Sequence, residues 1–347
     1  MRPLHSLSLA ALWLLSSLFW LCPASAAKVD EVIAAAKKEG ALEFHAASTL
    51  GPEGARALVG AFNKKHGLNI NVSYNPSGNM TRDVAKVVGL AASGVAPEWD
   101  LMIVTDAHHG TLWVRKLHIL FDYKSLGVDT NAIHYDSGTV SIANQMILPA
   151  YNKKILAAKD VPKKWDDLLD PKWKDGKLGV ISSTHHWARL AAGPWGVEKT
   201  TDFVKKLSAL KPILGRGGEI AQRLLLGEIL ISTTMHDDQI QEAAEKQSPL
   251  VFAEQVQPVI SAEYHAGVLK GALHPIAAHL FAAFLTTAEA QQILDKHLGL
   301  SSVHVKGTRA YQFAQGKELV FMKQDKAQMV DKLAREYGKI LGFDRGQ

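Results

Sequence analysis

Hydroxyl groups, two histidines and an arginine lie together in one short stretch of the sequence, from Ser182 to Arg189. This stretch follows an apolar run at 178–181 that is typical of a buried strand, and it opens a predicted helix. Unpaired N–H groups at a helix start favour an anion, and Arg189 could donate two hydrogen bonds to a carboxylate or phosphate. Two alternatives remain: Ser183 or Thr184 is an ordinary N-cap, and Arg189 pairs with a surface carboxylate. We expect Ser182, Ser183, Thr184 and Arg189 to contact a ligand.

Nitrogen and oxygen donors for a metal ion are adjacent at His236, Asp237 and Asp238. Hard cations accept carboxylates, and imidazole binds transition metals. Neighbouring side chains seldom all face one centre, so a solvated loop or contact with a nonmetal ligand are alternatives. His108 and His109 form a second adjacent pair, whose side chains should point in different directions.

Residue types that serve catalysis are present, but no motif supports them. The Gly-rich stretch at 215–219 lacks the Lys-Ser/Thr ending of a P-loop, and a flexible turn explains it. The sequence contains neither a G-x-S-x-G elbow nor an H-E-x-x-H pair. The single cysteine, Cys22, lies near the N-terminus. We therefore expect a binding protein rather than an enzyme, with no cofactor; turnover of a bound ligand would reverse this expectation.

The elements that position these residues begin with three strand–helix units. Strands are predicted at 41–46, 68–74 and 100–104, and helices at 29–38, 54–65 and 81–92. Consecutive units of this kind predict a parallel sheet, which binds ligands beyond the carboxyl ends of its strands. The loops at those ends supply further candidate ligand-binding residues: Ser48, Thr49, Ser77, Gly78 and Asp106.

A long apolar strand at 140–148 is a plausible crossing into a second lobe. Strands at 178–181 and 229–233 and helices at 200–210 and 219–226 follow, and 251–260 would cross back. Tyr264 then lies where the chain re-enters the first lobe, so its ring either lines a pocket or simply packs. The predicted helices at 274–286, 288–297 and 323–337 should pack on the first lobe. The expected organisation is therefore residues 27–140 in lobe 1, 141–262 in lobe 2 with the crossing strands, and 263–347 in lobe 1 again.

The first residues are typical of an export signal. Arg2 precedes an apolar run at 7–21, and Ala24 and Ala26 give the small-x-small pattern of a cleavage site. We expect residues 1–26 to be removed and the rest to reside in the periplasm. No later segment offers about 18 uncharged apolar residues in a row. The chain has 39 Lys and Arg against 34 Asp and Glu, and this mild positive charge is spread along the chain, which argues against nucleic-acid binding.

Three stretches, 149–152, 161–178 and 269–285, resemble the bacterial extracellular solute-binding proteins of the ferric-iron ABC importer type. The resemblance implies a two-lobed α/β fold, with each lobe a mostly parallel sheet flanked by helices and the two joined by crossing strands. It also implies a ligand held in the cleft between the lobes, a permease and its ATPase as partners, and a monomer. Within 161–178, Trp165 and Trp173 are expected to pack as scaffold without touching ligand.

Iron is where this sequence departs from the family that it resembles. Ferric-binding members carry two adjacent tyrosines after a Gly-Glu, whereas Gly227-Glu228 is followed here by ILISTTMHDD. We therefore expect a small organic or phosphorylated anion as ligand. Ferric iron remains the alternative, with His236, Asp237 and Asp238 as its candidate ligands.

Overall fold

The computed structural model describes residues 24–343. Within them, eleven strands form one sheet in the order β2-β1-β3-β10-β5-β8-β6-β7, with β4 and β9 paired to β5 and β11 paired to β10. Parallel pairs lie at both ends of this order, β2-β1-β3 and β8-β6-β7. The strands are β1 (Ala41–Ala47), β2 (Asn71–Ser77), β3 (Leu101–Thr105), β4 (Ile133–His134), β5 (Thr139–Asn152), β6 (Leu178–Ile181), β7 (Ile213–Gly215), β8 (Ile231–His236), β9 (Leu250–Phe252), β10 (Val259–Val268) and β11 (Leu319–Val320).

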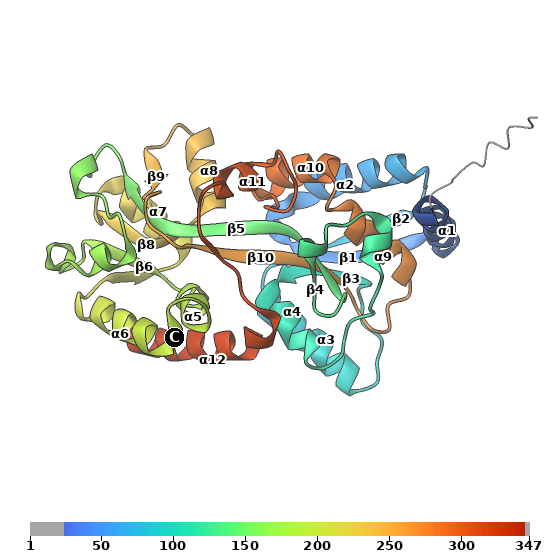
Figure 1. Cartoon of the computed structure of the whole chain (residues 1–347), viewed down its shortest axis with the longest axis horizontal. Helices are drawn as coiled ribbons and strands as arrows, with labels where there is room; N and C mark the ends of the chain where they lie inside the picture. Colours follow the sequence, from blue (N-terminus) through green and yellow to red (C-terminus); the bar gives the residue numbers. More distant parts are fainter. Residues whose placement is uncertain (1–23, 344–347) are drawn as a thin grey trace, which may run out of the picture.

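Strands β5 and β10 connect the two halves of the molecule (Figure 1). They pair antiparallel from Ile147 and Ile260 to Thr139 and Gly267. Because β3 joins one side of this pair and β8 the other, the sheets of both lobes are continuous through it. The two-lobed α/β class expected from the sequence is confirmed.

Each lobe has its own apolar core. Phe44, Phe62 and Phe281 are central to the first, while Trp165 and Trp187 are central to the second. None of the helices within residues 24–343 has the length and hydropathy that a bilayer span requires. The longer helices are α1 (Ala24–Glu39), α2 (Gly51–His66), α3 (Met80–Ala92), α4 (Asp106–Trp113), α5 (His185–Ala192), α6 (Gly196–Ala209), α7 (Gly217–Leu226), α8 (Asp237–Glu245), α9 (Pro275–Phe284), α10 (Ala288–Leu298), α11 (Arg309–Ala314) and α12 (Ala327–Leu341).

The C-terminal helix α12 packs mainly on the second lobe, so the expectation that it packs on the first is wrong. Its apolar face, which includes Val330, Leu333 and Tyr337, belongs to the second core. This face lies against α5 and α6 (Figure 1). Helices α9 and α10 do pack in the first core, as expected. The chain therefore passes between the lobes a third time between α10, which packs in the first core, and α11, whose Ala310 belongs to the second core.

Other boundaries also differ from the sequence-based expectation. The return crossing begins at Val259, because residues 250–252 instead form the short strand β9 against the far end of β5. Helices α4 and α8 occupy segments that were expected to be loops. The predicted export signal lies outside the described residues, except for its last three residues, which fall in the first turn of α1.

Candidate functional site

A cleft of about 780 Å³ lies between the lobes, on one face of the crossing strands. Helices α3 and α4 contribute its first-lobe wall, and α5, α12 and the end of β8 contribute its second-lobe wall. Side chains of the crossing strands, Gln145, Ala262 and Tyr264, complete the lining. The volume falls within the range usual for small-molecule sites. Of the predicted site residues, Ser183, Arg189, His236 and Tyr264 line this cleft.

Asp106 and Arg189 pair with each other across the two lobes. Arg189 Nη1 donates to Asp106 Oδ2 at 2.6 Å, and Nη2 donates to the other carboxylate oxygen. Both side chains are buried, at 1% exposure for Asp106 and 3% for Arg189. Burial alone would lower the pKa of Arg189, but the Asp106 carboxylate outweighs this effect and raises the pKa above its usual value. The guanidinium therefore stays charged. The two-point pairing expected of Arg189 is present, with a carboxylate from the protein itself. Its Nε remains a buried donor without a partner in the structure.

The loop before α5 divides between the cleft and the scaffold. Ser183 lines the cleft, whereas Ser182 is exposed outside the lining. Thr184 occupies the N-cap position but makes no side-chain capping bond. Its hydroxyl donates instead to the Ala334 carbonyl of α12 at 2.6 Å, which ties α5 to α12.

Histidines from three elements line the cleft. His236 Nε2 lies 3.2 Å from His186 Nε2, and His186 Nδ1 is buried without a partner in the described part of the chain. Burial, followed by the neighbouring His236, holds the pKa of His186 well below its usual value, and burial likewise lowers the pKa of His236. On the opposite wall, burial lowers the pKa of His108 to about 4. These imidazoles are therefore neutral at pH 7 and offer both donors and acceptors. His109 points away from His108 and contacts His265 O and His118 instead.

The proposed metal trio does not converge. Asp237 turns into the protein, where its carboxylate accepts from Met146 N at 3.0 Å and from Arg309 Nη1 at 3.4 Å. Burial raises the pKa of Asp237 to about 7. Asp238 lies 4.0 Å from His236 Nδ1 and accepts from Gln145. Since Asp237 is the first residue of α8, the chain turns into a helix there and the three side chains face different directions.

The loops after β1 and β2 do not reach this cleft. Ser48 and Thr49 are exposed in a short 3₁₀ turn, and Gly78 is exposed. Ser77 is buried, and its hydroxyl donates to Asp83 at 2.6 Å. None of these four residues lines the cleft within the described chain.

The sequence interpretation missed two arginines of the lining, Arg115 and Arg335. Arg335 pairs with Asp331 on α12, and Arg115 donates to the Thr111 carbonyl at 2.8 Å without an ion-pair partner among residues 24–343. Arg115 follows α4, a helix that the sequence did not reveal, and Arg335 lies on a helix assigned to the wrong lobe. No local motif marks either residue.

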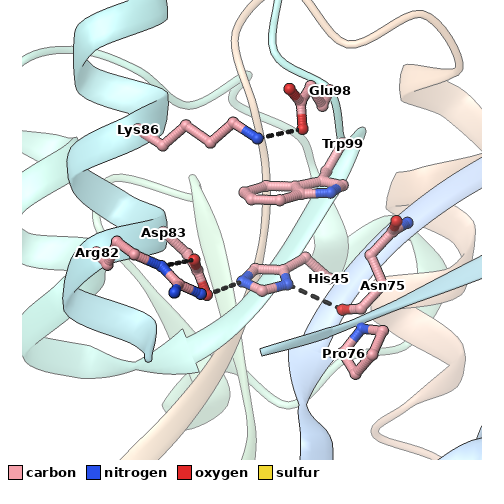
Figure 2. A pocket seen from close by; sticks show the side chains of 8 residues that line it. All are labelled: His45, Asn75, Pro76, Arg82, Asp83, Lys86, Glu98 and Trp99. Atoms are coloured by element: carbon pink, nitrogen blue, oxygen red, sulfur yellow. Dashed lines mark hydrogen bonds and ion pairs between the residues drawn. The ribbon is translucent and has the colours of Figure 1, made fainter. Parts of the chain in front are cut away.

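A second, smaller hollow of about 340 Å³ lies on the first lobe alone (Figure 2). His45 stacks on Trp99 with ring centroids 4.1 Å apart, and its Nε2 lies 3.2 Å from Asp83. Lys86 donates to Glu98 at 2.6 Å at its rim. Its charged groups thus pair with one another, which leaves the interlobe cleft as the better candidate for capturing a ligand.

Comparison with protein families gives one match. Residues 57–304 match the model of the bacterial extracellular solute-binding protein family. A search of curated proteins gave no match.

Solved structures share the fold at low sequence identity. Iron-bound HitA from Pseudomonas aeruginosa is 18% identical, with a TM-score of 0.68 over 86% of this chain and 99% of its own. The periplasmic binding protein AfuA from Actinobacillus pleuropneumoniae, with fructose-6-phosphate bound, is 16% identical, with a TM-score of 0.67 over 87% of this chain and 98% of its own. The Atu4243–GABA receptor structure is 18% identical, with a TM-score of 0.68 over 87% and 97%.

Proposed function

Because the chain belongs to the bacterial extracellular solute-binding protein family, we propose that its ligand is a small organic or phosphorylated anion held in the interlobe cleft. The observation that carries this proposal is the cationic lining of the cleft. Arg115, Arg189 and Arg335 line it, and Arg115 has no acidic partner among the described residues. A guanidinium without a carboxylate partner can donate charge-assisted hydrogen bonds to a carboxylate or phosphate of the ligand.

The position of the cleft supports capture by closure of the lobes. Its two walls come from different lobes, and the Asp106–Arg189 pair joins them at one point. Rotation about β5 and β10 would open the cleft and break this pair. A ligand that bridges the walls would favour the closed state, because it binds that state better than the open one.

Delivery to the permease of an ABC importer and its ATPase is the role that follows for such a receptor. We propose that the protein acts in the periplasm as a monomer, after removal of residues 1–26, and that it catalyses no reaction on its ligand. A closed, loaded receptor presents a different surface from an open one, and a permease could distinguish the two states by this difference.

Ferric iron is the second candidate, because iron-bound HitA is among the structures that share this fold. The donor set argues for the anion. Among the described residues, Tyr264 is the only tyrosine of the cleft lining, and burial raises its pKa above its usual value, which disfavours the phenolate that Fe³⁺ prefers.

Native mass spectrometry of protein purified gently from the periplasm tests this proposal, followed by thermal shift against sugar phosphates, carboxylates and ferric salts. A ligand that binds only the folded state raises its melting temperature. A retained organic anion, or a shift with one class of anion, would support the proposal. Bound iron, or a shift with ferric salts alone, would overturn it, and conversion of the bound compound into product would show an enzyme.

A further inference from the structure

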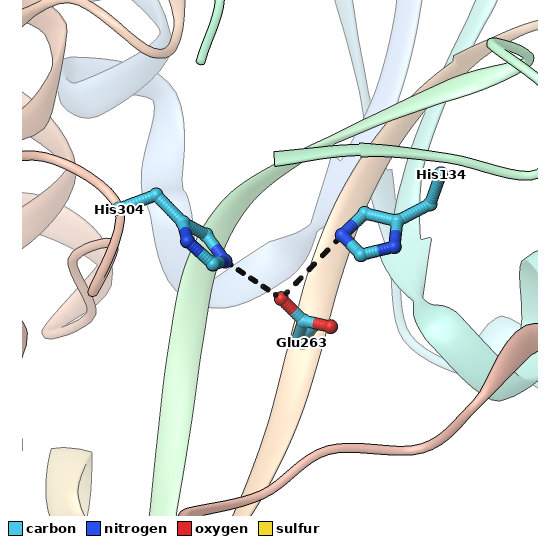
Figure 3. Close-up of side chains that lie close together, drawn as sticks. All are labelled: His134, Glu263 and His304. Carbon is cyan, nitrogen blue, oxygen red and sulfur yellow. Dashed lines mark hydrogen bonds and ion pairs between the residues drawn. The ribbon is translucent and has the colours of Figure 1, made fainter. Parts of the chain in front are cut away.

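Two histidines and a glutamate from separate segments lie together at the crossing strands (Figure 3). His134 is in β4, Glu263 is in β10, and His304 is in the loop between α10 and α11. One ligand atom from each lies within 4.8 Å of the other two. The Glu263 Oε1 atom is 3.3 Å from His304 Nε2 and 3.9 Å from His134 Nε2. Within residues 24–343, this is the one group of three or more such side chains close enough to share an ion.

This cluster is separate from the interlobe cleft. Ala262 and Tyr264 line the cleft, and Glu263 lies between them on β10. Because successive side chains of a strand point to opposite faces of the sheet, Glu263 faces the side away from the cleft. None of the three residues of the cluster lines the cleft. An ion held here would therefore not be the captured ligand.

The carboxylate of Glu263 is buried, at 1% exposure, without a lysine or arginine partner in the described chain. Ser141 donates to its Oε1 at 2.8 Å, and its ion-pair neighbours are all histidines. A buried carboxylate needs a compensating positive charge.

Two imidazole nitrogens near Glu263, His134 Nε2 and His265 Nε2, are buried without hydrogen-bond partners among residues 24–343. His134 Nε2 is directed at Glu263 Oε1 (Figure 3). His265 Nε2 lies 3.7 Å from the second carboxylate oxygen, and its ring stacks on His134 with centroids 4.6 Å apart. Such a nitrogen can face a carboxylate either as an N–H donor or, once it has lost its proton, with a cation between the two groups. A metal ion in this position would satisfy the carboxylate and the nitrogens together.

We propose that His134, Glu263 and His304 bind a divalent transition-metal ion, with zinc the best match to two imidazoles and one carboxylate. Zinc bonds of about 2.1 Å place tetrahedral ligand atoms roughly 3.4 Å apart. The two distances to Glu263 are 3.3 and 3.9 Å, and the two imidazole nitrogens lie within 4.8 Å of each other, so side-chain rotations that draw the histidines together would reach this spacing. Three protein ligands leave a fourth position for water or for His265 Nε2.

Each ligand is held by the fold, so the site is built before an ion arrives. The loop that carries His304 is anchored to β5, because Val303 N donates to Asn144 Oδ1 at 2.9 Å. His134 pairs in register with Thr139, the first residue of β5. A bound ion would thus link three segments, β4, β10 and the loop before α11. These segments lie at the crossing strands about which the lobes rotate.

Zinc titration of the chelator-stripped, full-length mature protein by calorimetry tests the proposal. We expect one zinc ion per chain, with roughly 100-fold weaker binding in Glu263→Gln and in His304→Asn. His236→Asn is the matched control, because it removes a histidine from the cleft and should leave zinc binding unchanged. X-ray absorption of the zinc-loaded wild-type protein should show two imidazoles in the coordination shell, and this measurement holds even if Glu263→Gln fails to fold.

Two outcomes would overturn the proposal. One is the absence of stoichiometric zinc binding by the wild-type protein. The other is zinc binding that His304→Asn leaves intact and His236→Asn abolishes, which would place the ion in the cleft. Neither result depends on the identity of the transported ligand, so failure of this site leaves the proposed anion capture untouched.

Discussion

Asp106, the first residue of α4, and Arg189, in α5, form a buried two-point ion pair that joins the two lobes. The residues are 83 positions apart in the sequence, and they lie on helices of different lobes. The pair therefore reports directly on whether the lobes are closed.

Removing one partner of this pair should destabilise the closed protein more than removing both. Asp106→Asn leaves a buried guanidinium unpaired, and Arg189→Met leaves a buried carboxylate unpaired; each should cost about 3–5 kcal/mol of unfolding free energy. The double variant should lose less than the sum of the two. Urea denaturation of all four proteins measures this coupling. Strict additivity would mean that the ligand-free protein is open in solution and does not form the pair.

Arg115 should contribute to ligand affinity without contributing to the fold. Within residues 24–343, its only side-chain hydrogen bond is to the carbonyl of Thr111 in the preceding turn, and it lines the cleft. We expect Arg115→Gln to weaken binding of the anion by about tenfold, the effect of one charge-assisted hydrogen bond. Arg56→Gln, which removes an exposed arginine from α2, is the control for net charge. If both substitutions weakened ligand binding equally, the loss of affinity would come from the change in net charge and not from a contact of Arg115.

Trp165 should matter for stability and not for binding. It is buried in the second core, its Nε1 donates to Pro258 O at 2.9 Å, and it packs edge-on against Trp187. Trp165→Ala should cost about 3–5 kcal/mol in unfolding free energy, measured by urea denaturation. The dissociation constant of the ligand, measured at a temperature where the variant is folded, should stay within about twofold of the wild-type value. Substitutions at sites far from each other usually affect one another by no more than this. A larger change in affinity would contradict its assignment as scaffold.

Stability should fall as the pH falls from about 6.5 to about 4. Burial lowers the pKa of His279 to about 3, and its Nδ1 lies within hydrogen-bond distance, 2.8 Å, of the buried Tyr123 hydroxyl. The unfolded chain, whose histidines titrate near 6.5, then binds more protons than the folded chain, and acid favours unfolding. Asp237 acts in the opposite direction, because its raised pKa of about 7 gives stability that is lost as the pH rises from about 4 through 7.

The substitution His279→Gln isolates the histidine contribution, since it keeps an acceptor for Tyr123 but removes the titration. Melting temperatures of both proteins between pH 4.5 and 7 provide the comparison. The variant should show a shallower decrease toward low pH, and Asp237 contributes equally to both curves. Identical slopes would show that His279 is protonated in the folded state.

The elements with strong apolar periodicity were predictable from the sequence, and those without it were not. The three opening strand–helix units and β6 lie close to where the spacing predicts them. Helix α4, with the sequence DAHHGTLW, has no apolar stripe, and α8 begins with two aspartates that are also typical of a loop. For α12 the helix itself was predicted, but a local pattern cannot identify the lobe on which its apolar face packs.

The sequence allowed individual residues of the candidate site to be predicted, but not which of them contact each other. Asp106 was selected in the loop after a strand and Arg189 in the first turns of the next predicted helix, yet their contact depends on how the lobes close. Arg115 and the cluster of His134, Glu263 and His304 follow no spacing rule, because tertiary structure alone brings them together. Adjacency misled in the case of His236, Asp237 and Asp238, where the start of a helix separates the side chains.

The division of each lobe among distant parts of the chain has a consequence for the order of folding. The first core needs α9 and α10, and the second core needs the apolar face of α12, which ends at Leu341. During synthesis, neither lobe can bury all of its apolar surface until nearly the whole chain has left the ribosome. Late assembly leaves apolar surface of both lobes exposed for longer, and a chain shortened before Ala327 would leave the second core open to water.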